Sequence, residues 1–227
     1  MIKLVVFDIA GTTVLDKGNV AIAFMDAFKK YGLSVPEAEV NKVMGFRKID
    51  AITSLLNAFY ASHTGNRKEL AENIHSAFTD NMIDYYTTTK DLQPLPHAEE
   101  IFSLLKSRNI RVALDTGFTK VITNTILKRL NWDKDKVDFV ISSDEVPEGR
   151  PSPYMIHGIM QTLGIPDVSD VAKVGDTEVD VAEGRNAGCG LVISVTTGAY
   201  TREQLEQYKP DAIIDSLNEL PALLQLN

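Results

Sequence analysis

The sequence predicts an α/β fold: a parallel β-sheet with helices on both faces and an all-helical segment inserted after the first strand. Residues 4–7 form an apolar run rich in β-branched residues, which is typical of a buried strand. Between positions 16 and 88 apolar residues recur at helical spacing, whereas short apolar strands alternate with helices from residue 89 onward. Strands that alternate with helices form parallel sheets, so the helical segment interrupts an α/β domain that resumes after it.

The amino-terminal strand ends in a carboxylate. We expect Asp8 to be the last residue of this strand, because a polar turn with Gly11, Thr12 and Thr13 follows it. An aspartate there, before a loop of free backbone N–H groups, suits a nucleophile that faces a phosphorus centre. Taken alone, the pattern also fits an aspartate that caps a helix or holds a turn.

The inserted segment is expected to hold helices at residues 20–28, 37–43, 48–60 and 68–86. Asn19 is a candidate N-cap for the first of them, and Gly32 is its stop signal. Pro36 opens the second helix, which is broken near Gly45. The polar turns on both sides predict a core domain of residues 1–15 and 89–227 and a helical domain of residues 16–88.

The second part of the chain predicts strands at residues 110–115, 139–142, 172–175, 191–195 and 212–214. The helices between and after them are expected at residues 98–107, 121–130, 154–163, 179–187 and 217–224. In such sheets ligands bind outside the carboxyl ends of the strands, so we expect the site at that edge.

Composition excludes several classes of partner. The net charge of this 227-residue chain is -8, which leaves no overall electrostatic footprint for nucleic acid or an anionic membrane. No apolar run approaches the ~20 residues that a membrane span needs. The single cysteine, Cys189, cannot form an internal disulfide, and no charged-then-apolar leader follows Met1. These features predict a cytoplasmic protein.

Four residues at predicted strand ends form a chemically coherent set: Asp8, Thr116, Arg150 and Asp176. Taken singly, Thr116 fits a helix N-cap, Arg150 a surface charge and Asp176 a turn. Together they supply a nucleophile, a hydroxyl donor, a guanidinium for phosphoryl oxygens and a second carboxylate.

The two aspartates also predict a metal site. Asp8 and Asp176 offer only hard oxygen ligands, which suits Mg²⁺. Asp180 lies four residues after Asp176, where it could orient the metal's waters or complement the amino terminus of its helix.

This ordered set resembles the haloacid dehalogenase superfamily over nearly the whole chain. The resemblance implies a Rossmann-like core with a helical cap, and phosphoryl transfer through an aspartyl-phosphate on Asp8. It implies Mg²⁺ held by Asp8, the backbone carbonyl of Ala10 and Asp176, with support from Thr177 and Asp180. The phosphate-binding residues that it implies are Gly11, Thr12, Thr116, Gly117 and Arg150.

Ala10 narrows the resemblance from the superfamily to one of its families. Phosphatases of the superfamily usually carry an aspartate at this position, as the acid that protonates the leaving oxygen, and an alkyl side chain cannot do so. Alanine here, arginine at position 150 and the segment from Met44 to Asp50 are similar to the phosphonoacetaldehyde hydrolase (phosphonatase) family. That resemblance places Lys48 at the lysine that forms a Schiff base with the substrate aldehyde.

The chemistry explains why Ala10 and Lys48 belong together. Cleavage of a P–C bond expels a carbanion, so an iminium that accepts electrons replaces a proton donor to oxygen. Lys48 must be neutral to attack, which requires desolvation or a cationic neighbour such as Arg47. A solvated surface lysine is the alternative. Ala51 and Phe118 stand where that family carries a histidine and a tyrosine, which leaves the substrate open.

We therefore expect a Mg²⁺-dependent hydrolase that cleaves a P–C bond in phosphonoacetaldehyde or a related phosphonate. The alternatives are a phosphomonoester phosphatase of the same superfamily, with its acid in the cap, and a non-catalytic phosphate-binding module. The expected partner is a small phosphonate or phosphate, and neither nucleic acid nor a membrane. The apolar surface of the predicted helix at residues 20–28 also leaves room for a homodimer, which the phosphonatase resemblance implies as well.

Overall fold

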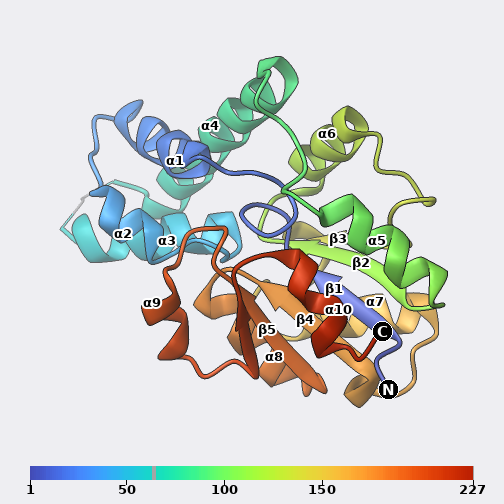
Figure 1. Cartoon of the computed structure of the whole chain (residues 1–227). Coiled ribbons are helices and arrows are strands. Elements are labelled where there is room, and N and C mark those ends of the chain that lie inside the picture. Colours follow the sequence, from blue (N-terminus) through green and yellow to red (C-terminus); the bar gives the residue numbers. More distant parts are fainter. Residues whose placement is uncertain (63–64, 227) are drawn as a thin grey trace.

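The computed structural model describes residues 1–62 and 65–226. Within these residues six parallel strands form one sheet in the order β3-β2-β1-β4-β5-β6 (Figure 1). They are β1 (Leu4–Phe7), β2 (Arg111–Thr116), β3 (Phe139–Ser142), β4 (Val171–Gly175), β5 (Leu191–Val195) and β6 (Ala212–Ile214). The amino-terminal strand thus lies in the middle of the sheet. The predicted α/β class with a parallel, Rossmann-like sheet is confirmed.

Both faces of the sheet are covered because side chains alternate along each strand. Val5 and Phe7 point into a cluster with α5 (Ala98–Ser107) and α10 (Leu220–Leu223), while Leu4 and Val6 point into a second cluster. This second cluster is formed with α7 (Tyr154–Leu163) and α8 (Glu178–Ala187). The remaining helices of this part are α6 (Lys120–Leu130) and α9 (Arg202–Glu206), with short 3₁₀ turns at Ser143–Glu145, Val168–Asp170 and Leu217–Glu219. A strand buried on both faces reads as a continuous apolar run, as residues 4–7 do.

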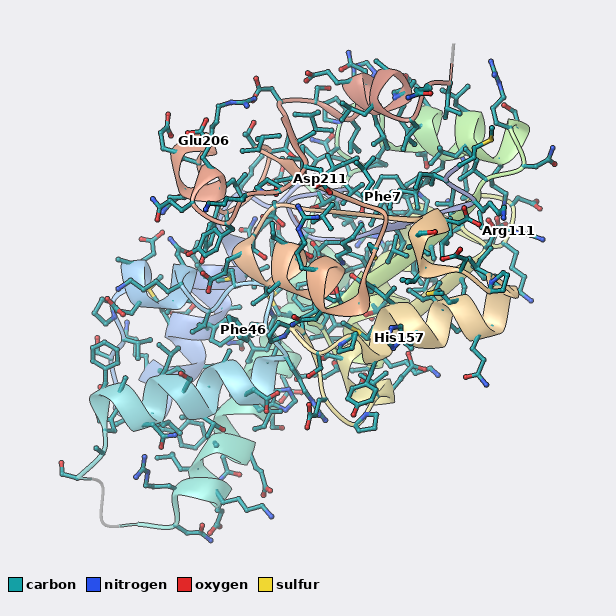
Figure 2. All side chains as sticks on the ribbon, turned by 90° about the horizontal axis from the view of Figure 1, so that it is seen from below. Phe7, Phe46, Arg111, His157, Glu206 and Asp211 are labelled. Atoms are coloured by element: carbon teal, nitrogen blue, oxygen red, sulfur yellow. The ribbon has the colours of Figure 1, made fainter. Side chains whose placement is uncertain are left out.

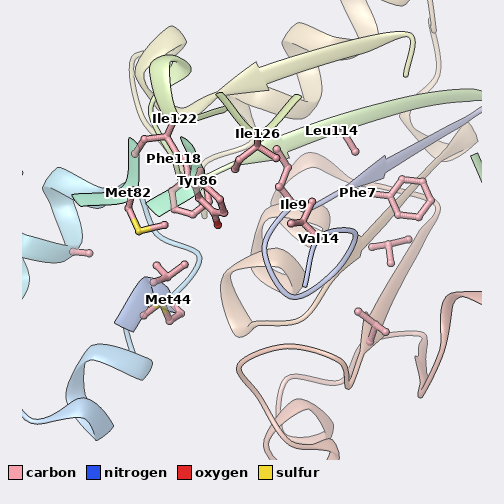
Figure 3. Close-up of a cluster of buried hydrophobic side chains, with 14 of the residues drawn as sticks. Phe7, Ile9, Val14, Met44, Met82, Tyr86, Leu114, Phe118, Ile122 and Ile126 are labelled. Carbon is pink, nitrogen blue, oxygen red and sulfur yellow. The ribbon is translucent and has the colours of Figure 1, made fainter. Parts of the chain in front are cut away.

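Among the described residues between β1 and α5, the helices lie together on one side of the sheet (Figure 1). They are α1 (Asn19–Lys29), α2 (Glu37–Asn41), α3 (Lys48–Phe59) and α4 (Arg67–Thr88). We call residues 16–88 the insertion. Its apolar side chains and those of the sheet-containing part form one cluster (Figure 3). Tyr86 of α4 packs edge to face on Phe118, with ring centroids 6.0 Å apart. The insertion is therefore anchored on the residues that follow β2.

The predicted elements differ from the observed ones mainly at their ends. Asp8 is not the last residue of β1 but the residue after it. Asn19 is not the N-cap of α1 but its first residue, and the Asp16 side chain accepts its backbone N–H at 2.8 Å. The last predicted helix is split into a 3₁₀ turn and α10, and α9 was not predicted. A helix as short as α9 lacks a full apolar stripe, so periodicity could not indicate it.

The apolar face of α1 is buried inside the chain. Six of its residues, Val20, Ala21, Ala23, Phe24, Ala27 and Phe28, are buried, and Phe24 contacts Phe78 of α4 with ring centroids 4.6 Å apart. Ile22 of the same helix, however, is 50% exposed, and the homodimer stays a prediction. None of the described helices combines the length and apolar character needed to cross a membrane.

Candidate active site

Three site residues meet because their strands are neighbours. Asp8 follows β1, Thr116 ends β2 and Asp176 follows β4, and β1 lies between the other two strands. All three line a cavity of about 180 Å³, which Lys48 of α3 also lines. Residues predicted from widely separated motifs thus share one space between the sheet and the insertion.

Arg150 does not line the cavity but forms a buried ion pair with Asp8. The Arg150 side chain is fully buried. Its Nη2 donates to Asp8 Oδ1 at 2.6 Å, and its Nη1 donates to Asp180 Oδ1 at 2.5 Å. Burial raises the pKa of Asp8 to about 6, although the Arg150 charge opposes this rise. Arg150 therefore fixes one oxygen of Asp8 and favours its ionised form.

Asp176 is held by neutral donors. Thr12 Oγ1 donates to its Oδ1 at 3.2 Å, and the backbone N–H of Ala199 donates to its Oδ2 at 2.7 Å. Burial and the nearby charge of Asp8 raise the pKa of Asp176 well above its ordinary range. Two buried carboxylates that line one cavity suit a divalent metal ion. Asp8, Ala10 and Asp176, the residues that the resemblance implies for Mg²⁺, all line this cavity.

A second group of carboxylates is neutralised by side chains. Oxygens of Asp8, Asp115 and Asp180 lie within 4.8 Å of one another. However, the Arg150 guanidinium contacts Asp8 and Asp180, and the Lys173 ammonium contacts Asp115 and lies 3.3 Å from Asp180. Because the positive charges of Arg150 and Lys173 already pair with these oxygens, this group is a less suitable metal site than the pair Asp8 and Asp176.

Lys173 is a site residue that sequence reasoning missed. It lies on β4, is fully buried, and pairs with Asp115 and, at 3.0 Å, with Glu183 Oε2. Burial lowers its pKa, but the charges of Asp115 and Glu183 outweigh this effect and raise it. The sequence feature that could have indicated it is a lysine within an otherwise apolar strand, because a buried lysine requires carboxylate partners.

We expect Lys173→Met to lower the free energy of unfolding by about 3 kcal/mol or more, because it leaves buried carboxylates without their cation. Urea unfolding followed by circular dichroism measures this loss. Lys3→Met is the matched control, since Lys3 forms the same kind of pair with Asp170 at 2.5 Å but is 57% exposed. Equal destabilisation by the two substitutions would contradict a special role of the buried pair.

Lys48 faces the cavity from the insertion. It is 4% exposed, its Nζ donates to the Phe46 carbonyl at 3.3 Å, and it lies 5.7 Å and 5.3 Å from the ring centroids of Phe24 and Phe118. Burial and, to a smaller degree, the Arg150 charge lower the pKa of Lys48 to about 8. This lowered pKa increases the neutral fraction of the amine near neutral pH, which favours its action as a nucleophile.

The segment 44–47, which we call the closing loop, packs tightly on the rest of the chain. Figure 2 labels Phe46 at the junction of the insertion with the sheet-containing part. A Cβ on Gly45 would lie 2.3 Å from Val179 Cγ2, and one on Gly117 would lie 2.4 Å from the Phe46 carbonyl oxygen. These close approaches place Lys48, the next residue, over the strand ends.

We expect Gly45→Ala to lower turnover by about 10²-fold, because an added methyl group at this contact moves the closing loop and Lys48 away from Asp8. Gly32→Ala is the matched control: both glycines have positive φ (82° and 71°), but nothing lies within 4 Å of a Cβ on Gly32. Steady-state kinetics of both variants check this expectation. Similar losses would show that backbone strain, and not loop contact, is responsible.

The structure also separates residues that line the cavity from residues behind it. Ala10, Gly11, Gly117 and Thr177 line it, whereas Thr12 orients Asp176 from behind. Thr116 lines the cavity while its hydroxyl accepts the Phe118 N–H at 3.1 Å.

Arg150 and Asp180 belong to the group behind the cavity. The Arg150 guanidinium pairs with the carboxylates of Asp8 and Asp180. Asp180 also accepts a hydrogen bond from the Thr177 hydroxyl at 2.6 Å. Asp180 thus fixes the position of the Arg150 guanidinium. The Arg150 charge lowers the pKa of Asp180, although the burial of Asp180 opposes this effect.

Asp16, Gly198 and Ala199 also line the cavity, and they were not predicted as site residues. Gly198 and Ala199 follow β5, whose carboxyl end reaches the same edge of the sheet.

The comparisons with known proteins agree with this geometry. The model of the haloacid dehalogenase-like hydrolases matches residues 2–188. Phosphonoacetaldehyde hydrolase of Bacillus mycoides (strain KBAB4) is 32% identical over 224 residues, which cover 92% of this chain and 83% of that protein. The crystal structure of a hydrolase from Pseudomonas syringae has a TM-score of 0.86 at 19% identity and 99% coverage of both chains. A phosphonoacetaldehyde hydrolase-like protein from Oleispira antarctica has a TM-score of 0.82 at 23% identity, with 99% of this chain and 91% of that chain covered.

Proposed function

We propose, since the chain belongs to the haloacid dehalogenase-like hydrolase family, that it cleaves the P–C bond of phosphonoacetaldehyde or a related aldehyde or ketone phosphonate. The observation that carries this proposal is Lys48. It is a buried lysine with a lowered pKa that lines the same small cavity as Asp8. Hydrolysis of a phosphate ester has no use for a neutral amine, whereas an aldehyde next to the reacting carbon does.

In this proposal the phosphoryl group binds at the strand ends. Asp8 attacks phosphorus with the oxygen that Arg150 does not hold, and Thr116 and Gly117, which line the cavity, bind the phosphoryl oxygens. The N–H groups of Gly11, Thr12 and Thr13 do not serve this purpose, because they donate to backbone carbonyls of their own turn. Asp8, the Ala10 carbonyl and Asp176 would hold Mg²⁺, which when bound neutralises charge on the phosphoryl oxygens. Water then hydrolyses the aspartyl-phosphate.

Lys48 provides the electron sink. Its neutral amine adds to the aldehyde carbon, and after the adduct oxygen takes up a proton, loss of water leaves a protonated imine two bonds from phosphorus. When Asp8 takes the phosphoryl group, the electron pair of the P–C bond moves into this iminium and forms an enamine. The enamine takes up a proton on the carbon that phosphorus has left, and hydrolysis of the resulting iminium releases acetaldehyde and free Lys48. Ala10 is consistent with this route, because no leaving oxygen has to be protonated there. The closing loop then explains how an amine of the insertion reaches a phosphonate bound to the strand ends.

We further propose that residues 16–88 act as a cap over a core of residues 1–15 and 89–227. The insertion contributes Lys48 and Met44 to the cavity, and the strand ends contribute Asp8, Thr116 and Asp176. The cavity of about 180 Å³ between the two parts suits a small substrate. Opening of the closing loop would admit substrate and release product.

The test is the release of acetaldehyde and phosphate from phosphonoacetaldehyde by the purified protein. We expect both products in equal amounts in the presence of Mg²⁺, and loss of turnover on addition of a chelator that excess Mg²⁺ reverses. Release of phosphate from phosphate monoesters without any phosphonate cleavage would instead identify a phosphomonoesterase and overturn the proposal. Unreactive Asp8 towards both substrate types and towards beryllofluoride would identify a non-catalytic phosphate-binding module.

A further inference from the structure

A carboxyl group of the insertion shares the cavity with Lys48. Asp16 lies in the polar turn between β1 and α1, and it lines the cavity on the side of the insertion. One of its oxygens accepts the backbone N–H of Asn19 at 2.8 Å, which fixes the side chain at the amino terminus of α1. The charges of Asp16 and Lys48 influence each other across this space.

Imine chemistry at Lys48 needs a proton donor that the phosphoryl site does not supply. The oxygen of the first adduct must be protonated to leave as water, and the water that later hydrolyses the imine must lose a proton. Asp8 and Asp176 are engaged with the phosphoryl group and the metal in the proposed function. Ala51 and Phe118, both close to Lys48 in the fold, carry no exchangeable side-chain proton.

The other acidic group at the cavity is less suited. Glu37 lines the cavity but is exposed at the start of α2. Asp16 is half-buried, and burial raises its pKa although the N–H groups of Gly18, Asn19 and Val20 favour its ionised form. The titratable groups of other elements that face Asp16 are Lys48 from α3 and Tyr86 from α4. A carboxyl group that lines the same cavity as the amine is suited to exchange protons with an adduct formed on that amine.

We propose that Asp16 is the general acid and general base of imine formation and hydrolysis at Lys48, an inference that rests on the proposed function. The neutral amine adds to the aldehyde carbon, forms the C–N bond and yields a neutral carbinolamine after a proton moves from nitrogen to oxygen. The Asp16 carboxyl then gives its proton to the carbinolamine oxygen. The C–O bond breaks, water leaves, and the nitrogen lone pair forms the C=N bond, so that an iminium and the Asp16 carboxylate remain. In hydrolysis the carboxylate takes a proton from the attacking water.

The test uses Asp16→Asn, because an asparagine oxygen can still accept the Asn19 N–H while the side chain cannot donate a carboxyl proton. Wild type and variant are mixed with phosphonoacetaldehyde, and the imine is trapped with borohydride at successive times. We expect trapping at Lys48 to slow by about 10²-fold in the variant. Thermal unfolding and the binding of beryllofluoride with Mg²⁺ at Asp8 should match the wild type. Asp16→Ser, which also keeps a capping oxygen, should behave in the same way.

The outcomes separate this inference from the proposed function. If borohydride traps no adduct at Lys48 in the wild-type protein, the proposed function fails and the inference fails with it. If the wild type is trapped and Asp16→Asn is trapped equally fast, the inference is overturned while the proposed function stands. Tyr86→Phe is the second variant: a slowed trapping rate in this variant, with Asp16→Asn unaffected, would assign the proton to the tyrosine and overturn the role of Asp16.

Discussion

Asp8→Asn is expected to reduce phosphonate cleavage by about 10⁴-fold or more, because the amide that replaces the carboxylate cannot act as the nucleophile. The substitution preserves size, and Arg150 keeps its contact with Asp180, so the guanidinium should stay in place. Turnover and the formation of a beryllofluoride adduct with Mg²⁺ are the two measurements. We expect both to be lost in the variant.

The control for Asp8 is the same substitution in a neighbouring aspartate. Asp115 is fully buried, pairs with Lys173 and lies 3.8 Å from Arg150, but it does not line the cavity. Asp115→Asn should therefore destabilise the protein yet reduce turnover far less than Asp8→Asn. If Asp8→Asn kept more than about 1% of the activity, a difference of less than about 3 kcal/mol in transition-state stabilisation, Asp8 could not be the nucleophile.

Lys48→Arg is expected to lower phosphonate cleavage by about 10⁴-fold as well, since a guanidinium keeps the positive charge but forms no imine. Hydrolysis of a phosphate monoester, wherever it is detectable, should fall much less, because it does not use the amine. Borohydride added with phosphonoacetaldehyde should inactivate the wild-type protein and leave Lys48→Arg unmodified. The lowered pKa of Lys48, about 8, predicts that wild-type trapping accelerates as the pH rises towards that value.

Lys42→Arg is the matched control for Lys48. Lys42 also belongs to the insertion, but its side chain is 67% exposed and pairs with Glu39 at 2.7 Å. The conservative substitution there should leave phosphonate cleavage unchanged. A parallel loss of phosphonate and ester hydrolysis in Lys48→Arg, with intact folding, would contradict the imine role and indicate that Lys48 contributes only charge to the site.

The fold class could be predicted from the sequence because it depends on patterns that are local. Residues 4–7 are apolar throughout since β1 is buried on both faces, and the strands after residue 110 are separated by helices with apolar stripes. The polar turns around residues 15 and 89 likewise flank the helices α1 to α4 of the insertion. Ends of elements were less predictable, because a cap such as Asp16 acts from outside the helix that it stabilises.

The residues of the site could be predicted in part for the same reason. Asp8, Thr116 and Asp176 stand directly at strand ends, and parallel strands bring these ends to one edge. Lys48 was indicated by the phosphonatase resemblance, and the structure brings it to the same cavity. Lys173 was missed because its role depends on ion pairs with Asp115 and Glu183. These pairs form only in the folded chain, and the spacing of the three residues in the sequence does not indicate them.

The sequence by itself determined the six strands and, apart from α9, the order of the helices between them, together with the polar turns and the chemical types available at the strand ends. Only the tertiary structure decided which charges neutralise one another: Arg150 lies behind Asp8 with Asp180, and does not line the cavity. Only the tertiary structure brought Asp16 to the same cavity as Lys48. The reason is physical: propensity and periodicity act over a few neighbouring residues, whereas burial, pKa shifts and ion pairing depend on groups that meet only when the insertion packs on the sheet.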